Sequence, residues 1–340
     1  MINEKKKKKP VWLIPTALIV VLLIGATVLA VGKNSQKREE EQRKASEAEQ
    51  TQGGTSKPGV VTWNGKEYVY NEHLSNFLFL GIDKREQTET KAGQADAGQA
   101  DALFLVTWDR MKNDMTLISI PRDTMTEIEI FGKNGESLGT NQNHISLSYG
   151  YGDGKDQSCN LTKKAVSNLL YGIPIQGYCS VSMDGIPVMI GSVGGMTVTV
   201  PNDSLQEKFP EFAQGQQIVL NEENTETFVR YRDITKSQSA IKRLERQQEF
   251  LRQYALRAEQ AFAENPGFIS QMYLDMEPYM VTNMSTDQFV KLMEGAMTGG
   301  DLKTWTVPGE GVEGEMFDEY YVDDKALYEQ IMQTFYVEKE

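Results

Sequence analysis

The chain has 340 residues, of which 39% are hydrophobic and 24% are charged, which is the composition of a globular protein with a packed core. Its formal net charge is −13, and because residues 1–32 carry +4, the remainder carries −17. An acidic body argues against a general binder of nucleic acid or of anionic lipid surfaces. Any phosphate site must therefore be a local cluster of arginines.

Cysteine and histidine are too scarce for most metal and nucleophile chemistry. The chain contains only Cys159, Cys179, His73 and His144, so neither a zinc site of the usual Cys/His type nor a Ser-His-Asp triad is expected. The two cysteines can form one disulfide if the body lies outside the cytosol. Inside the cytosol they are expected to be two buried thiols.

The N-terminus predicts a membrane anchor. Lys5 to Lys9 form a basic block within residues 1–10, and residues 11–32 contain no charged side chain. At helical rise this stretch spans roughly 33 Å, about the thickness of the hydrocarbon core. Lysines before the span and an acidic body after it indicate a single-pass protein of the cell membrane, with residues 1–10 cytoplasmic and the body extracytoplasmic. Residues 33–71 are expected to form a polar stalk.

A cleaved signal peptide is the alternative interpretation of this segment. The sequence Val28-Leu29-Ala30 resembles a small-residue cleavage site. The apolar run is longer than a typical signal-peptide core, so we favour the uncleaved anchor.

Three short apolar runs predict strands at residues 76–82, 103–108 and 115–120. The second and third are joined by residues 109–114, which is short enough for a hairpin. In an antiparallel meander, the end of the first strand, the start of the second and the end of the third would meet at one edge of the sheet. The side chains placed at that edge are Asp83, Arg85, Asp101, Arg122 and Asp123. A different route of the connection between the first two runs would reverse the pairing, so this convergence depends on the meander.

Helices and strands alternate along the rest of the chain. Helical patterns occupy residues 161–171, 240–263, 286–297 and 324–335, and strand patterns occupy residues 196–200, 227–232 and 304–307. In the first helix, Thr162 is the expected cap, and Val166, Leu169 and Leu170 form the apolar stripe. Such alternation predicts an α/β fold, namely a single layered α-β-α domain with a central mixed sheet, preceded by one transmembrane helix. The domain should span residues 72–340, with core blocks at 76–255 and a C-terminal α/β continuation at 265–340.

Several of these residues suit pyrophosphate and a hard cation. Arg230 and Arg232 share one face of the predicted strand 227–232, and Arg243 and Gln247 share one face of the next helix. Guanidinium groups donate paired hydrogen bonds to phosphate oxygens, and paired carboxylates suit Mg²⁺. From spacing alone, a solvated arginine stripe and aspartates that cap turns are the more frequent explanation.

Six segments, in order, resemble the LytR–CpsA–Psr family between about Asn76 and Leu251. The most specific is LISIPRDTMTEI at 117–128, which contains the family's S-I-P-R-D signature. The others are LFLGIDKR at 78–85, ADALFLVTWD at 100–109, HISLSYGYGDG at 144–154, VGGMTVTVP at 193–201, and FVRYRD at 228–233 with RLERQQEFL at 243–251.

The resemblance implies a glycopolymer–peptidoglycan phosphotransferase. Such an enzyme moves a teichoic acid, capsule or other wall polymer from a polyprenyl-pyrophosphate carrier to peptidoglycan and releases polyprenyl monophosphate. Its implied partners are the lipid-linked glycan, the peptidoglycan acceptor and the membrane, without nucleic acid. By position, the pyrophosphate would be bound by Arg85, Arg122, Arg230, Arg232, Arg243 and Gln247. Asp83 and Asp101 would hold Mg²⁺ or Mn²⁺, while Arg122 and Asp123 would be catalytic, with Asp123 orienting an arginine or accepting the hydroxyl proton.

Three positions depart from the family pattern. Gln99 stands where the family usually has arginine, His144 where it has lysine, and Ala240 where it has aspartate. These changes remove up to two positive charges and one carboxylate from the pocket. Two alternatives therefore stay open. One is a non-catalytic or weakly active member that binds lipid-linked intermediates and regulates envelope assembly, and the other is a pyrophosphatase that uses water as the acceptor.

Overall fold

The computed structural model describes residues 59–85, 90, 93, 95–132, 134–299, 302–314 and 317–339. The predicted anchor at 11–32 and most of the predicted stalk lie outside these residues. No helix in the described ranges is long and apolar enough to cross a bilayer. Residues 55–340 form one compact unit.

A six-stranded mixed sheet runs through the domain in the order β11-β8-β3-β4-β5-β12. Its strands are β3 (Leu74–Ile82), β4 (Ala100–Asp109), β5 (Asp114–Ile120), β8 (Gly177–Val181), β11 (Met280–Thr282) and β12 (Lys303–Thr306). β3, β4 and β5 pair antiparallel, which confirms the predicted meander and its hairpin. β8 and β12 pair parallel with β3 and β5, so the sheet is mixed as predicted.

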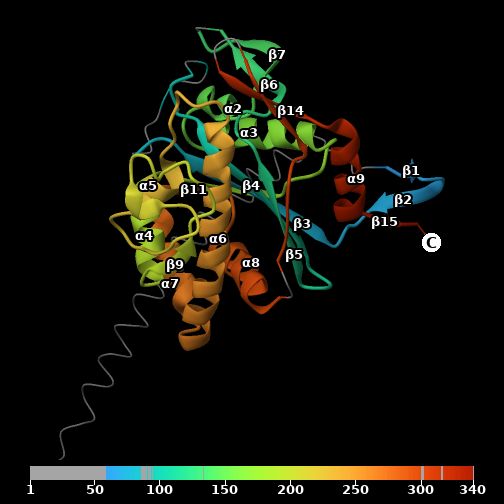
Figure 1. The fold of residues 1–340 in the computed structure, drawn as a ribbon. Coiled ribbons are helices and arrows are strands. Elements are labelled where there is room, and N and C mark those ends of the chain that lie inside the picture. The colour runs from blue at the N-terminus through green and yellow to red at the C-terminus, as the bar shows by residue number, and fades with distance from the viewer. Residues whose placement is uncertain are drawn as a thin grey trace, which may run out of the picture. The chain divides into compact units, whose positions relative to one another are not determined.

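Helices cover both faces of this sheet (Figure 1). Alternate residues of β3 point to opposite faces, so that Leu78 and Leu80 enter one apolar cluster and Phe77 enters the other. The first cluster is completed by α2 (Leu147–Gly150), α3 (Asp156–Leu169) and α9 (Asp324–Phe335). The second is completed by α4 (Gly185–Ser192), α5 (Thr225–Arg230), α6 (Ser239–Glu264), α7 (Phe268–Met276) and α8 (Thr286–Thr298). The layered α-β-α arrangement therefore follows from strands that are apolar on both faces.

Short strand pairs lie around the central sheet. They are β6 (Met125–Phe131) with β7 (Ser137–His144), β9 (Met196–Thr199) with β10 (Gln217–Leu220), β13 (Gly309–Glu313) with β14 (Asp318–Val322), and β1 (Val61–Trp63) and β2 (Lys66–Tyr70) with β15 (Tyr336–Glu338). Two short 3-10 helices, η1 (Pro210–Phe212) and η2 (Glu277–Tyr279), complete the described elements. The strand β9 begins after Gly194 and Gly195, whose positive φ values allow a tight entry into the strand.

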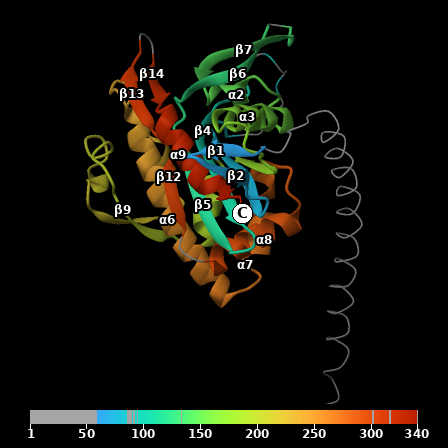
Figure 2. The same cartoon turned by 90° about the vertical axis from the view of Figure 1, so that its right-hand side faces the viewer.

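The predicted stalk is too long at its C-terminal end. Residues 61–70 form the hairpin β1–β2, which pairs through β2 with β15. Figure 1 shows these three strands together, and Figure 2 shows the C-terminus beside β2. Asn64 and Gly65 have positive φ values of 49° and 77°, as a two-residue hairpin turn requires. The Asn-Gly pair was the available sequence signal, and the polar composition around it concealed the strands.

Two further predictions of local structure are wrong. Residues 227–232 do not form a strand, because α5 ends at Arg230 and Tyr231 and Arg232 follow in an extended loop. The amides of Phe228 and Tyr231 donate to the carbonyls of Asn224 and Thr227, as in helical turns. In addition, α3 begins at Asp156, which places Thr162 inside the helix rather than at its cap. The remaining helices and β12 lie within a few residues of their predicted bounds.

Cys159 and Cys179 are both buried and free. Cys179 lies on β8 in the second apolar cluster, whereas Cys159 lies on α3 in the first, so the sheet separates their surroundings. Burial raises the pKa of the Cys179 thiol to about 12 and also raises that of Cys159. The sequence allowed either one disulfide or two buried thiols, and the structure contains the two buried thiols.

We expect neither thiol to react with a disulfide reagent while the protein is folded, because each is enclosed and protonated. Titration of the full-length protein with Ellman's reagent should give no colour under native conditions and two thiols after unfolding in guanidinium chloride. If the reagent detects no thiol after unfolding without a reductant, the two cysteines form a disulfide instead.

Candidate functional site

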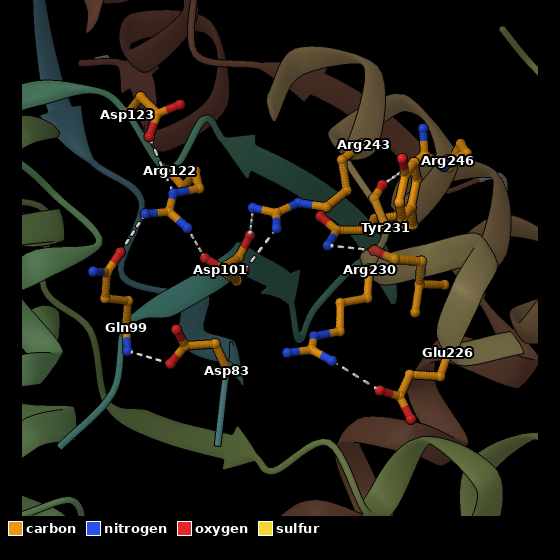
Figure 3. A network of polar contacts seen from close by, with 12 residues as sticks. Asp83, Gln99, Asp101, Arg122, Asp123, Glu226, Arg230, Tyr231, Arg243 and Arg246 are labelled. Carbon is orange, nitrogen blue, oxygen red and sulfur yellow. Dashed lines mark hydrogen bonds and ion pairs between the residues drawn. The ribbon is translucent and has the colours of Figure 1, made fainter. Parts of the chain in front are cut away.

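Two arginines from distant parts of the chain meet at one carboxylate. Asp101, at the start of β4, accepts an Arg122 Nη1 hydrogen bond at Oδ1 and an Arg243 Nη1 hydrogen bond of 2.7 Å at Oδ2. Arg243 Nη2 also donates to the backbone oxygen of Asp101 at 3.3 Å. Figure 3 shows Asp101 between the two guanidinium groups. The convergence predicted for this edge of the sheet is thus confirmed for Asp101 and Arg122, and α6 adds Arg243.

Arg122 is held on three sides. Its Nε donates to Asp123 Oδ1 at 3.0 Å, and its Nη2 donates to Gln99 Oε1. Burial is the main reason why the pKa of Arg122 falls to about 10, and the nearby Arg243 lowers it further. The guanidinium stays protonated at neutral pH, so a positive charge is kept in a poorly hydrated place.

Arg243 is more deeply enclosed, with 3% of its side chain exposed. Burial and the neighbouring Arg232 lower its pKa to about 10. Its Nε has no hydrogen-bond partner among the described residues, and nor has Gln247 Oε1 one turn later on α6. Ala240, at the start of the same helix, offers no side-chain acceptor. The site therefore contains buried polar atoms that a ligand can satisfy.

A third arginine, Arg246, was not singled out by the sequence analysis. It is fully buried and donates to the backbone oxygens of Phe228 and Tyr231 and to Ser204 Oγ. Gln247 Nε2 donates to the carbonyl of Val229 at 3.1 Å. Together these bonds attach the end of α5 to α6. The sequence signal was its place in the same Arg-rich segment as Arg243, one turn along the helix.

The other predicted arginines are arranged differently. Arg85 pairs with Asp184 at 3.2 Å and with Glu226 at 2.8 Å, and Arg230 pairs with the same Glu226 at 3.1 Å. Their side chains are 60% and 47% exposed, so they form an outer cluster beside the buried one. Arg232 lies close enough to Arg122 and Arg243 to lower the pKa of both.

Asp83 lies at the same edge of the sheet as Asp101 (Figure 3). Its Oδ1 accepts the backbone N–H of Gln99 at 2.6 Å, and its own amide donates to the Gln99 carbonyl at 3.1 Å. No cluster of three or more acidic, histidine or cysteine side chains suited to a metal occurs in the described part of the chain. The carboxylates of Asp83 and Asp101 are nevertheless enough protein ligands for Mg²⁺, because this ion usually takes its remaining ligands from phosphate and water.

His144 is the last residue of β7 and lies beside Arg122 and Asp123, the two residues predicted to be catalytic. Its Nδ1 lies 3.8 Å from Asp123 Oδ1, and the two side chains are 12% and 11% exposed. Burial is the main cause that lowers the pKa of His144, although Asp123 raises it. The imidazole is therefore neutral at pH 7, as expected from the sequence.

Replacing Arg246 by methionine should destabilise the domain, because the carbonyls of Phe228 and Tyr231 would lose a buried charged donor. We expect the free energy of unfolding to fall by about 3 kcal/mol. Chemical denaturation of the full-length protein followed by tryptophan fluorescence measures this change. The matched control is Arg252→Met on the same helix, where the arginine is 60% exposed and pairs only locally with Glu249. Equal losses in the two variants would contradict a special role for Arg246.

The LytR_cpsA_psr family matches residues 27–335. TagV of Bacillus subtilis, named a polyisoprenyl-teichoic acid–peptidoglycan teichoic acid transferase, is 36% identical over 128 residues, covering 38% of this chain and 28% of TagV. The chain thus spans under a third of that relative's length. TagU of Bacillus cereus strain AH820, a transferase of the same name, is 27% identical over 270 residues, covering 77% of this chain and 78% of TagU.

Solved structures share the fold. Bacillus subtilis TagV superposes with a TM-score of 0.59 at 23% identity, covering 78% of this chain and 98% of that one. TagT bound to LI-WTA gives a TM-score of 0.59 at 20% identity, covering 77% and 90%. At these identities the likeness concerns the mixed α/β fold alone. Because the family match extends over nearly the whole chain, the chain belongs to the LytR_cpsA_psr family.

Proposed function

We propose that the protein is a membrane-anchored phosphotransferase that moves a glycopolymer from a polyprenyl-pyrophosphate carrier to peptidoglycan and releases polyprenyl monophosphate. The supporting observation is the pair of buried arginines, Arg122 and Arg243, which meet at Asp101. Family membership and the names of the TagU and TagV relatives support the class of reaction. An anchor at residues 11–32 would confine the enzyme to the surface that carries its lipid substrate.

The buried arginines suit a pyrophosphate donor. A guanidinium in a poorly hydrated site interacts strongly with an anion, because little water screens the two charges. Asp101 is the acceptor shared by Arg122 and Arg243. We propose that pyrophosphate oxygens replace it there, with the unpartnered Nε of Arg243 as a further donor. Gln247 would join them only by turning its Nε2 away from the Val229 carbonyl, to which it donates in this structure. The outer pair, Arg85 and Arg230, would meet the part of the substrate nearer to solvent.

Asp83 and Asp101 are the residues proposed to hold Mg²⁺ or Mn²⁺. Once released from the arginines, Asp101 would share the ion with Asp83, which lies at the same edge of the sheet. When bound, the ion would neutralise charge on the phosphate oxygens. Arg122 and Arg243 would stabilise the charge that develops during transfer, since their positions are set before the reaction by α6 and the sheet.

The Arg122→Ala variant tests this role. Full-length protein in detergent would be incubated with Mg²⁺ and a polyprenyl-pyrophosphate glycan, with and without peptidoglycan oligomers, and the products followed by mass spectrometry. Loss of one preorganised donor costs roughly 10²–10³-fold in rate. We expect a decrease of that size for Arg122→Ala and none for the exposed control Arg252→Ala.

The same assay separates the alternatives. Lipid monophosphate that forms only with the acceptor supports the transferase. Equal release without acceptor would instead indicate a pyrophosphatase. Tight binding of the donor without release, in the presence of metal and acceptor, would indicate a non-catalytic member that binds lipid-linked intermediates.

Metal dependence gives a further prediction. Chelation by EDTA should abolish transfer, and Mg²⁺ should restore it. Asp83→Asn should raise the Mg²⁺ concentration needed for half-maximal rate by at least about tenfold, since even a second-layer partner of a metal site changes affinity by that much. Asp275→Asn, an exposed change on α7, is the control. An unchanged Mg²⁺ requirement in Asp83→Asn would argue against this metal site.

A further inference from the structure

His144 is fixed next to Arg122 and Asp123 by backbone hydrogen bonds. β6 and β7 pair antiparallel, with Met125 opposite His144. Beyond that pair, the amide of Ile145 donates to Thr124 O at 2.9 Å, and the amide of Ser146 donates to Arg122 O at 3.2 Å. The imidazole and the catalytic arginine are therefore positioned by one continuous ladder.

The Asp123 carboxylate binds Arg122 and lies near His144. Its Oδ1 accepts Arg122 Nε at 3.0 Å and lies 3.8 Å from His144 Nδ1. Because this oxygen can only accept a proton donor, we infer that Nδ1 carries the hydrogen of the neutral imidazole. The lone pair then lies on Nε2, the nitrogen from which an imidazole can act as a base.

Charged groups from several elements face the imidazole. Asp123, just before β6, and Glu319, on β14, raise the pKa of His144. Arg122 and Arg232 lower it, and burial lowers it most. The ring of Phe317 packs edge-on against it, with 6.4 Å between the ring centres. The result is an unprotonated imidazole near neutral pH, within a site that keeps its arginines charged.

We propose that His144 is the general base that accepts the proton of the acceptor hydroxyl in this chain. The inference rests on the proposed transferase function and assigns Asp123 the positioning of Arg122 and His144. The hydroxyl oxygen forms a bond to the phosphorus that carries the glycan, while its proton moves to His144 Nε2. The bond from that phosphorus to the lipid phosphate oxygen breaks, and its electron pair leaves on polyprenyl monophosphate. The imidazolium then returns its proton to water.

The pH dependence of kcat/KM tests the base. Activity of the wild type should rise with pH through the pKa of His144, because only the neutral imidazole accepts a proton. The midpoint should lie below the ordinary value of 6.5, since the pKa is lowered. His144→Gln should lose this acid limb and about 10²-fold or more in rate. The matched control is His73→Gln, which changes the chain's other histidine, an exposed residue, and should leave the profile unchanged.

A lysine at the same position separates proton transfer from charge. Lysine is protonated at pH 7 and so cannot act as a base. We expect His144→Lys to be as slow as His144→Gln, whereas a wild-type rate in His144→Lys would overturn the proposal that His144 is the base. A wild-type rate for His144→Gln, with the acid limb of its pH profile intact, would likewise overturn the proposal that His144 is the general base.

A third measurement does not depend on how the His144 variants fold. The His73→Gln protein contains His144 as its single histidine, so ¹³C-labelled imidazole reports one titration. Its midpoint should coincide with the acid limb of kcat/KM, and a clear mismatch would overturn the proposal. If the wild type releases no lipid monophosphate at all, the transferase function fails with it. If the wild type is active but the His144 variants keep its rate and pH profile, only the assignment of His144 as the general base fails.

Discussion

Two guanidinium groups converge on the Asp101 carboxylate, one from the end of β5 and one from α6. Arg122 and Arg243 carry like charges in a poorly hydrated place, so each destabilises the other unless an anion lies between them. Asp101 provides that anion in the described structure. The same arrangement makes the site suited to phosphate, because an incoming anion meets donors that are already charged, desolvated and aimed.

Helix α6 connects this site to the core. Near its start α6 presents Arg243, Arg246 and Gln247 as buried residues, and the turns that follow pack Phe250 and Tyr254 into the second apolar cluster. The rigidity of the site thus depends on apolar packing one to three turns away. Arg246 extends this support to the end of α5, which carries Arg230 and precedes Arg232.

The departures from the family pattern have structural consequences. Gln99 loses a charge but accepts a hydrogen bond from Arg122 and supports Asp83 through its backbone. Its neutrality reduces repulsion among the arginines. Ala240 offers no acceptor to Arg243, whose Nε has no partner among the described residues. His144 replaces a permanent charge by a group that can take up a proton, which is why the site can contain its own base.

Periodicity and turn spacing were sufficient to predict the β4–β5 hairpin, and with it the meeting of Asp101 and Arg122, because both follow from local alternation and one short turn. The pairing of β3 with β4 depended on the route of the connection between them, which local pattern did not decide. The family resemblance predicted that Arg243 and Gln247 belong to this site, and the structure places Arg243 at Asp101. Local pattern failed at residues 227–232, where the Arg-Tyr-Arg alternation is that of a strand but Arg246 holds the carbonyls of a helix end. Tertiary structure alone decided which arginines share Asp101, which share Glu226, and that His144 faces Asp123. These choices depend on contacts between residues distant in the chain, which no local pattern encodes.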